Sequence, residues 1–508
     1  MNRHIFCSLL LITGIFGFAQ EDDKILTLHK SLDPRSVVEH LAFYELYPDT
    51  ELGKRALRKA WELLADSNLI DTWALQRIPP CDVQALVRLV THQTHDPPMQ
   101  LEEEQLIVIE RIARNLHNRK LQGFGVEERE KILALAPEEI DLARALLLFQ
   151  FDPPDIQKIR RYEANIDIMA LQIRARLSAN ASYEEKIHVM NHFLFQEMGF
   201  RFPPHSLYAR HIDHYTFLPS VLDSRQGVCL GISILYLSLA QRLDLPLEII
   251  TPPGHIYLRY RKGEEVMNIE TTARGIDTPS EMYLGVNTRL LQVRNMKETV
   301  GFAFINQAST LWDAKEYKQC IALYEKARLF IPNDPSLQMF LGCNHFLRGN
   351  YKKAISFLQR VRNHPSEVEV SPSTLPEDIL LGRVDRDAFK AIFMPVNETR
   401  ASILAKQEAL QQALKRCPRF REGLMQLAVT YLQLNRLREA EEILLKYHSY
   451  DDTNVIVEYY LALIALQRWN HQRSWSHLKR AEMLCRNSHH SPKALQDLRR
   501  SLLMRCPE

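Results

Sequence analysis

Apolar and polar residues follow one another with helical spacing over most of the chain. Apolar residues recur every three or four positions in Arg55–Ala65, Leu101–Leu116 and Ile168–Leu177, which places them on one face of a helix. We expect a helical N-terminal region over residues 20–139. The pattern changes to that of strands between residues 247 and 270 and returns to helices afterwards. The predicted fold class is therefore an α+β core between a helical N-terminal region and an all-α solenoid at the C-terminus.

The first nineteen residues have the pattern of a targeting segment. Arg3 and His4 precede an apolar run from Ile5 to Ala19, and Gly17 and Ala19 form a small-x-small pattern before polar Gln20. This pattern is typical of a secretory signal peptide over 1–19, cleaved after Ala19. We expect a periplasmic or secreted bacterial protein. The alternatives are an uncleaved membrane anchor and a buried N-terminal helix.

The C-terminal half contains an internal repeat with a period of 34 residues. Tyr317 and Ala327 recur one period later as Tyr351 and Val361. The units predicted are 301–334, 335–368, a degenerate 387–420, 421–454 and 455–488, with a C-terminal tail over 489–508 and an insertion over Glu367–Glu398. The repeat resembles the tetratricopeptide repeat, which implies a solenoid with a groove for a protein or peptide partner. The alternative is that the solenoid only supports the neighbouring domain.

The segment between residues 140 and 300 contains the candidate chemistry. We predict a helix over Glu185–Gly199 and a strongly apolar helix over Cys229–Leu243. Cys229 lies in the first turn of the second helix, where unpaired N–H groups and the helix dipole favour a thiolate.

Three strands are predicted after this helix, over Leu247–Thr251, His255–Tyr260 and Glu265–Glu270. A hairpin loop at Lys262-Gly263, or at Arg261–Glu264, places His255 directly opposite Glu270. Opposed residues share one face of a sheet, so the carboxylate can orient the imidazole. An imidazole beside Cys229 can take its proton, which completes a nucleophile, base and orienting acid.

These residues occur within a set of familiar motifs. The set comprises Asn191–Phe195, Met198–Phe200, Leu218–Asp223, Gly227–Cys229, Leu243–Pro246, Pro253–His255, Asn268–Glu270 and Gly275. It resembles the transglutaminase-like superfamily, a papain-related fold, and specifically a bacterial branch joined to tetratricopeptide repeats. The resemblance covers 140–300 and implies that Cys229 is the nucleophile, His255 the general base and Glu270 the orienting acid. The family usually has Asp at the third position and tryptophans near it, whereas this chain has Glu270, Tyr257 and Ile269.

The leading function is an exported thiol enzyme: a protease, amidase or acyl transferase that forms an acyl-enzyme on Cys229. The alternative is a non-catalytic protein-binding scaffold with a degenerate core, in which Cys229 is only a packed thiol. Asn268 is a rival orienting residue, and Glu270 could instead cap the Thr271-Thr272 turn. Because Asp is the commoner acid, Glu270→Asp is expected to be tolerated.

Composition limits the other function classes. Lys and Arg number 64 against 62 Asp and Glu, a net charge of +2, which argues against a nucleic-acid partner. No cofactor is expected, and apart from Asp213 no Cys or carboxylate at zinc-site spacing completes the trio His205, His211 and His214. Eight cysteines are too few for a disulfide scaffold, although a Cys320–Cys343 disulfide is an alternative to free thiols. No apolar run beyond the N-terminus is long enough to span a bilayer.

Overall fold

The computed structural model describes residues 18–64, 101–203, 215–397 and 399–507. The chain forms two compact units. The first contains the residues up to Lys120, Asp155–Met198 and Ser238–Leu245, and the second contains Leu121–Pro154, Gly199–Leu237 and the chain from Pro246 onwards. Most of the predicted signal segment, residues 1–17, lies outside the described residues. Among the described helices, none combines the length and the apolar character needed to cross a bilayer.

The first unit is helical. Its helices are α2 (Phe18–Ser31), α3 (Val37–Leu46), α4 (Glu51–Leu64), α7 (Glu103–Ile112), α10 (Ile156–Arg176) and α11 (Tyr183–His192). Three of them lie where the apolar spacing predicted helices, at α4, α7 and α10. The predicted helix Glu185–Gly199 is formed by α11 and by a π-helical turn over Phe193–Glu197 that follows it directly.

A buried ion pair fixes the end of helix α13 (Cys229–Arg242) within the first unit. The Arg242 guanidinium is fully buried and donates from Nε to Asp167 on α10 at 2.6 Å. Arg119 also pairs with Asp167. A buried carboxylate needs such partners to offset the loss of its hydration, so the pair anchors the end of the helix that begins with Cys229.

The second unit contains a four-stranded antiparallel sheet. Its strands are β1 (Glu248–Thr251), β2 (Tyr257–Lys262), β3 (Glu265–Ile269) and β4 (Gln292–Arg294), in the order β3-β2-β1-β4. The first three confirm the predicted strands. Strand β4 was missed, because three residues are too few for a readable alternation.

The predicted hairpin register is wrong by two residues. Lys262 pairs with Glu265 and Leu258 with Ile269, so the two-residue loop is Gly263-Glu264. Gly263 has a φ of +60°, and a glycine at the first loop position suits a type II′ turn. Because the error is an even number of residues, the side chains keep their faces.

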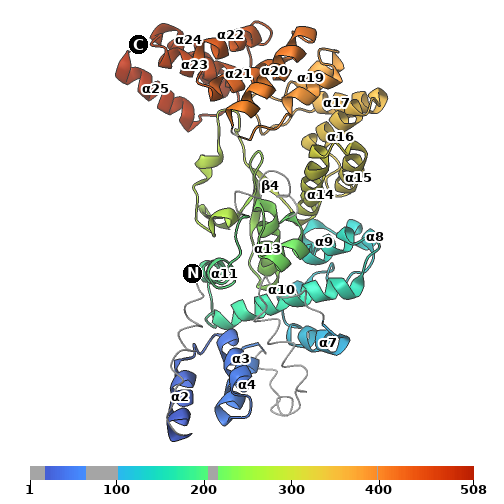
Figure 1. Cartoon of the computed structure of the whole chain (residues 1–508), viewed down its shortest axis with the longest axis vertical. Helices are drawn as coiled ribbons and strands as arrows, with labels where there is room; N and C mark the ends of the chain where they lie inside the picture. The colour runs from blue at the N-terminus through green and yellow to red at the C-terminus, as the bar shows by residue number, and fades with distance from the viewer. Residues whose placement is uncertain (1–17, 65–100, 204–214, 398, 508) are drawn as a thin grey trace. The chain divides into compact units, whose positions relative to one another are not determined.

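The repeat region consists of paired antiparallel helices (Figure 1). The pairs are α14 (Met296–Asp313) with α15 (Tyr317–Arg328), α16 (Pro335–Leu347) with α17 (Tyr351–Asn363), α21 (Arg421–Gln433) with α22 (Leu437–His448), and α23 (Val455–Gln467) with α24 (His471–Asn487). The starts of α15 and α17 are 34 residues apart, as are those of α21 and α23. A Cβ on Gly342 of α16 would lie 2.7 Å from Leu358 of α17, so a small residue allows this pair to approach closely.

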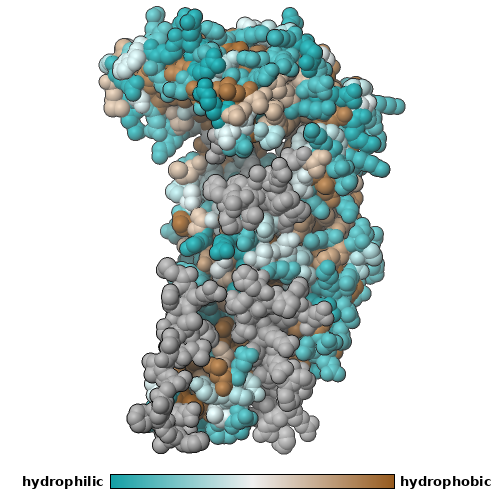
Figure 2. Space-filling view, in the orientation of Figure 1, coloured by the Kyte–Doolittle hydropathy of each residue, from teal (hydrophilic) through white to brown (hydrophobic). Residues whose placement is uncertain are grey.

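The predicted insertion and tail both contain packed helices. Helices α18 (Leu375–Leu380) and α19 (Arg386–Ile392) join α20 (Arg400–Arg416) in the core of the repeats. Helix α25 (Lys493–Arg505) buries Leu495, Leu498 and Leu502 against the last pair. The visible face of the repeats is mainly hydrophilic (Figure 2), as expected for helices whose apolar faces are buried.

The buried thiols Cys320 and Cys343 are both free, so the alternative of a disulfide between them is not supported. Burial raises the pKa of Cys320 to about 11 and that of Cys343 to about 12, which keeps both as unreactive thiols.

Candidate active site

The candidate nucleophile, Cys229, is the first residue of α13. Its position depends on a close backbone approach at Gly231, where a Cβ would lie 2.1 Å from the Tyr215 carbonyl oxygen. The Thr271 hydroxyl contacts the Ser233 hydroxyl at 3.1 Å and the Cys229 carbonyl at 3.5 Å. These contacts tie the first turn of α13 to the residue that follows Glu270.

A tight turn places His255 just before β2. The His255 N–H donates to the Pro252 carbonyl at 3.1 Å, and Gly254 between them has a φ of +72°. Proline at the second position and a left-handed glycine at the third are the signature of a type II turn. The turn presents an imidazole whose side chain is 25% exposed.

Glu270 lies directly after β3, and its carboxylate is saturated with hydrogen bonds. His255 Nε2 lies 2.6 Å from Oε2, and the Tyr283 hydroxyl donates to the same oxygen at 2.5 Å. Oε1 accepts from the Thr272 N–H at 3.1 Å and from the Thr272 hydroxyl at 2.6 Å. Glu270 therefore caps the turn and also binds His255, so the two roles set against each other in the sequence occur together.

The corrected register explains how Glu270 reaches His255. Extended along the ladder, the observed pairing puts Glu270 across from Tyr257, two residues beyond His255 on the same face. Diagonal neighbours on a sheet are roughly 7–8 Å apart, so a long side chain is needed. The glutamate at a position usually held by aspartate fits this geometry.

The electrostatics of the pair favour an imidazolium. Burial alone would lower the pKa of His255, but hydrogen bonds with Cys229 and Glu270 raise it to about 9. Burial opposes ionisation of Glu270, yet its bonds to His255, Thr272 and Tyr283 hold its pKa at about 2. Because Nε2 faces Glu270, Nδ1 is the ring atom left for Cys229.

Tyr283 is a site residue that the sequence reasoning missed. It lies in the 3-10 turn Ser280–Tyr283. Its ring stacks on those of His255 and Tyr257, with the ring centroids 5.6 Å and 4.5 Å apart, respectively. Burial and the Glu270 carboxylate raise the pKa of Tyr283. Two tyrosines thus line the positions near which the family usually has tryptophans. Tyr283 belongs to no strand or regular helix, and its only signal in the sequence was the nearby Gly275 motif.

Asn268, the rival orienting residue, is engaged elsewhere. Its side chain donates to the Thr278 carbonyl at 2.6 Å and accepts from Arg259 Nε at 3.0 Å. These bonds hold β3 to the segment that leads to Tyr283, and neither of them involves His255.

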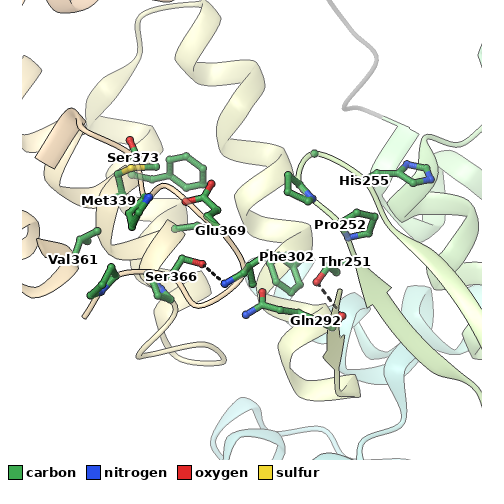
Figure 3. Close-up of a pocket in the computed structure, with 18 of the residues that line it drawn as sticks. Thr251, Pro252, His255, Gln292, Phe302, Met339, Val361, Ser366, Glu369 and Ser373 are labelled. Atoms are coloured by element: carbon green, nitrogen blue, oxygen red, sulfur yellow. Dashed lines mark hydrogen bonds between the residues drawn. The ribbon is translucent and has the colours of Figure 1, made fainter. Parts of the chain in front are cut away.

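Cys229 and His255 line a cavity of about 810 Å³. One wall comes from the core, through Pro252, Pro253 and Gln292. The other comes from the repeat region, through Phe302 on α14, Met339 on α16, Val361 on α17 and several residues between 365 and 377 (Figure 3). Volumes of this size are typical of ligand sites.

The described residues contain no cluster of three or more His, Cys, Asp or Glu side chains arranged to hold a metal ion. The histidines at 205, 211 and 214 lie outside the described residues.

Comparison with known proteins supports the core. Residues 160–283 match the family model of the transglutaminase-like superfamily. A UPF0162 protein of Xylella fastidiosa is 23% identical over 23% of this chain and 41% of its own length. A UPF0162 protein of Pseudomonas aeruginosa is 34% identical over 18% of this chain and 32% of its own. The human F-box only protein 21 is 30% identical over 16% of this chain and 12% of its own length. The chain therefore spans less than half the length of these relatives.

Solved structures similar to this chain include two tetratricopeptide-repeat proteins. YrrB, described as having an unusual peptide-binding site, is 14% identical, with a TM-score of 0.20 over 39% of this chain and 92% of its own. A tetratricopeptide-repeat protein of Thermus thermophilus is 16% identical, with a TM-score of 0.20 over 40% of this chain and 97% of its own. The repeat assignment itself rests on the helix pairs and their 34-residue spacing. The chain thus combines a transglutaminase-like core with tetratricopeptide-like repeats.

Proposed function

We propose that this chain is a cysteine-dependent enzyme that cleaves or transfers an acyl group through a thioester on Cys229. The observation that supports this most strongly is the His255 imidazole, held by a 2.6 Å bond to Glu270 in the cavity that Cys229 also lines. A packed structural thiol needs no such neighbour.

In the first step, the Cys229 thiolate attacks the carbonyl carbon of an amide. The backbone N–H groups at the start of α13 point toward the developing oxyanion and stabilise it. The C–N bond breaks as His255 gives its proton to the leaving amine. With a pKa of about 9, the imidazole carries that proton at neutral pH.

In the second step, neutral His255 removes a proton from water or from an acceptor amine. The oxygen or nitrogen attacks the thioester, the C–S bond breaks and the thiolate is restored with an imidazolium beside it. The choice between water and amine distinguishes hydrolase from transferase. Glu270 keeps the ring in place throughout, because its other bonds come from Thr272 and Tyr283 rather than from substrate.

The proposal extends to the rest of the chain. The repeat region would bind a protein or peptide partner, since paired helices of this kind expose a continuous concave surface. The pattern of residues 1–19 favours export to the periplasm or medium.

The test is alkylation of the full chain by iodoacetamide, with each cysteine followed by peptide mapping. Cys229 should react faster than Cys417, which is also partly exposed but has a raised pKa through burial. Cys229→Ala should remove the fast reaction, and Cys417→Ala should keep it. If Cys229 reacts no faster than Cys417, the chain is better described as a binding scaffold with an inactive core.

A further inference from the structure

The repeat-side wall of the cavity includes the segment 365–374, which lies between α17 and α18. The neighbouring segment after the core holds it in an extended conformation. The Arg289 N–H donates to the Val368 carbonyl at 2.9 Å, and the Val370 N–H donates to the Asn287 carbonyl at 2.8 Å. Asn287 also exchanges side-chain bonds with the backbone of Ser371, at 2.7 and 3.1 Å. This wall is therefore built in, and its side chains have fixed directions.

The extended backbone determines which way Glu369 points. Thr288 and Glu369 form an antiparallel bridge, and successive side chains of extended backbone alternate. Val370 packs against the apolar cluster of the last repeats. Glu369 is consequently turned toward the cavity, which it lines together with Met339 and Phe302 (Figure 3).

The Glu369 carboxylate is half-buried and has no cationic partner within ion-pair distance in the described structure. Burial raises its pKa, opposed only by a hydrogen bond from the Ser373 backbone. Burying a carboxylate without a counter-charge is unfavourable, so a function at this position has to be considered.

The other charged groups of the cavity wall differ in this respect. Arg294 pairs with Asp334 at 3.0 Å, and Arg421 pairs with Asp378 at 2.8 Å and with Asp451 at 3.2 Å. Arg362 is exposed, where water screens its charge. Glu369 is thus the cavity carboxylate whose charge is least compensated.

We propose that Glu369 binds a positively charged side chain, lysine or arginine, of a polypeptide whose acyl group lies at Cys229. This rests on the proposed function and adds the class of substrate. Phe302, Met339 and Val361 offer apolar surface beside Glu369 for the aliphatic stem of such a side chain, with the charged head at the carboxylate. A polypeptide fits better than a small amine, because the acyl site and Glu369 are on opposite walls of a large cavity.

The test uses reagents that modify thiols without catalysis: alkyl thiosulfonates of increasing chain length, each ending in either an ammonium or a methyl group. Each modifies Cys229 of the full chain, and peptide mapping follows that residue. At one chain length, the ammonium reagent should react about tenfold faster than its neutral partner, as expected for one additional ion pair in a partly buried site.

In Glu369→Gln, the ammonium reagent of that length should lose its advantage over its neutral partner. The ratio of the two rates should fall to that measured with the shorter reagents, which do not reach Glu369. Glu367→Gln is the matched control, because Glu367 is an exposed carboxylate two residues away, and it should keep the full preference. An unchanged preference in Glu369→Gln, or no preference at any length in the wild type, would overturn the inference.

This outcome is separable from that of the proposed function. Thiosulfonates exchange with any accessible thiol, so the ammonium preference is measurable even if the core is inactive. A wild-type preference together with an ordinary iodoacetamide rate would keep Glu369 as a cation site and remove the enzyme.

Discussion

Two glutamates near the cavity have opposite surroundings. Glu270, in the core behind His255, has both carboxylate oxygens bonded and a pKa of about 2. Glu369, on the repeat wall, has one backbone donor, and burial raises its pKa. The first carboxylate is complete without a ligand and serves the protein's own imidazole. The second is incomplete, which is the property expected of a group that binds something from outside.

The largest effect should come from removing the general base, His255. His255→Ala should slow alkylation of Cys229 by about 100-fold, the lower range for loss of a general base. His364→Ala, an exposed histidine on the repeat side, is the control and should leave the rate unchanged. Rates from iodoacetamide time courses check this, and equal rates for wild type and His255→Ala would remove His255 from the site.

A change of side-chain length at Glu270 tests the diagonal geometry. The sequence favoured tolerance of Glu270→Asp, but the observed register puts the carboxylate two residues out of line with His255. We now expect Glu270→Asp to slow alkylation by about tenfold, because the shorter arm cannot keep both His255 and Thr272. Glu270→Gln should give a similar loss. A wild-type rate for Glu270→Asp would mean that the backbone adjusts to restore the contact.

The charge of Glu270 should be visible in the titration of His255. Its pKa of about 9 depends on two bonded partners, Cys229 and Glu270. Glu270→Gln removes a negative charge, so the pKa should fall toward the ordinary value of about 6.5. Nuclear magnetic resonance of ring-labelled histidine, with His255→Ala to assign the signal, measures this. A pKa near 9 in Glu270→Gln would assign the shift to Cys229 alone.

Tyr283 should have a smaller effect than Glu270. Tyr283→Phe removes the hydroxyl that donates to Glu270 but keeps the ring that stacks on His255. We expect alkylation to slow only a few-fold, because Tyr283 acts on the imidazole only through Glu270, which keeps its two bonds from Thr272. Tyr283→Leu, which also removes the stacking, should slow it further. Equal rates for the two variants would mean that the ring contributes nothing.

How much of the structure the sequence predicted depends on whether a feature arises from local spacing or from contacts between distant segments. The repeats were readable, because local spacing places Tyr317 and Tyr351 at equivalent helix starts. Cys229 was readable for the same reason, as the start of one apolar helix. The hairpin register was not readable, because it depends on which loop position Gly263, the residue with the positive φ, occupies. The predicted loop has Gly263 second, and the structure has it first.

Contacts between distant segments could not be read from the sequence. The stacking of Tyr283 on His255 joins the 3-10 turn that ends at Tyr283 to the tight turn before β2, and neither turn has a periodic pattern. Glu369 belonged to a segment interpreted only as an insertion. Its direction is set by hydrogen bonds to Asn287 and Arg289, roughly 80 residues earlier in the chain.

The most direct comparison of the two glutamates is on stability, where the change at Glu369 should be small. A carboxyl whose folded pKa is depressed stabilises the protein above its unfolded pKa and loses this as the pH falls through the folded value. Glu270, whose folded pKa is about 2, therefore stabilises the protein at pH 7, and Glu270→Gln should cost roughly 2–3 kcal/mol of unfolding free energy.

For Glu369 the effect on stability has the opposite sign, because a raised folded pKa penalises the charged form as the pH rises. Glu369→Gln should therefore stabilise the chain at pH 7, by no more than about 1 kcal/mol, and should have no benefit at a pH below its unfolded pKa. Urea unfolding of the three proteins at pH 7 and pH 4 measures both signs, and Glu367→Gln again serves as the exposed control. A loss of stability in Glu369→Gln at pH 7 would mean that Glu369 already has a stabilising partner inside the protein, and the contrast between the two glutamates would disappear.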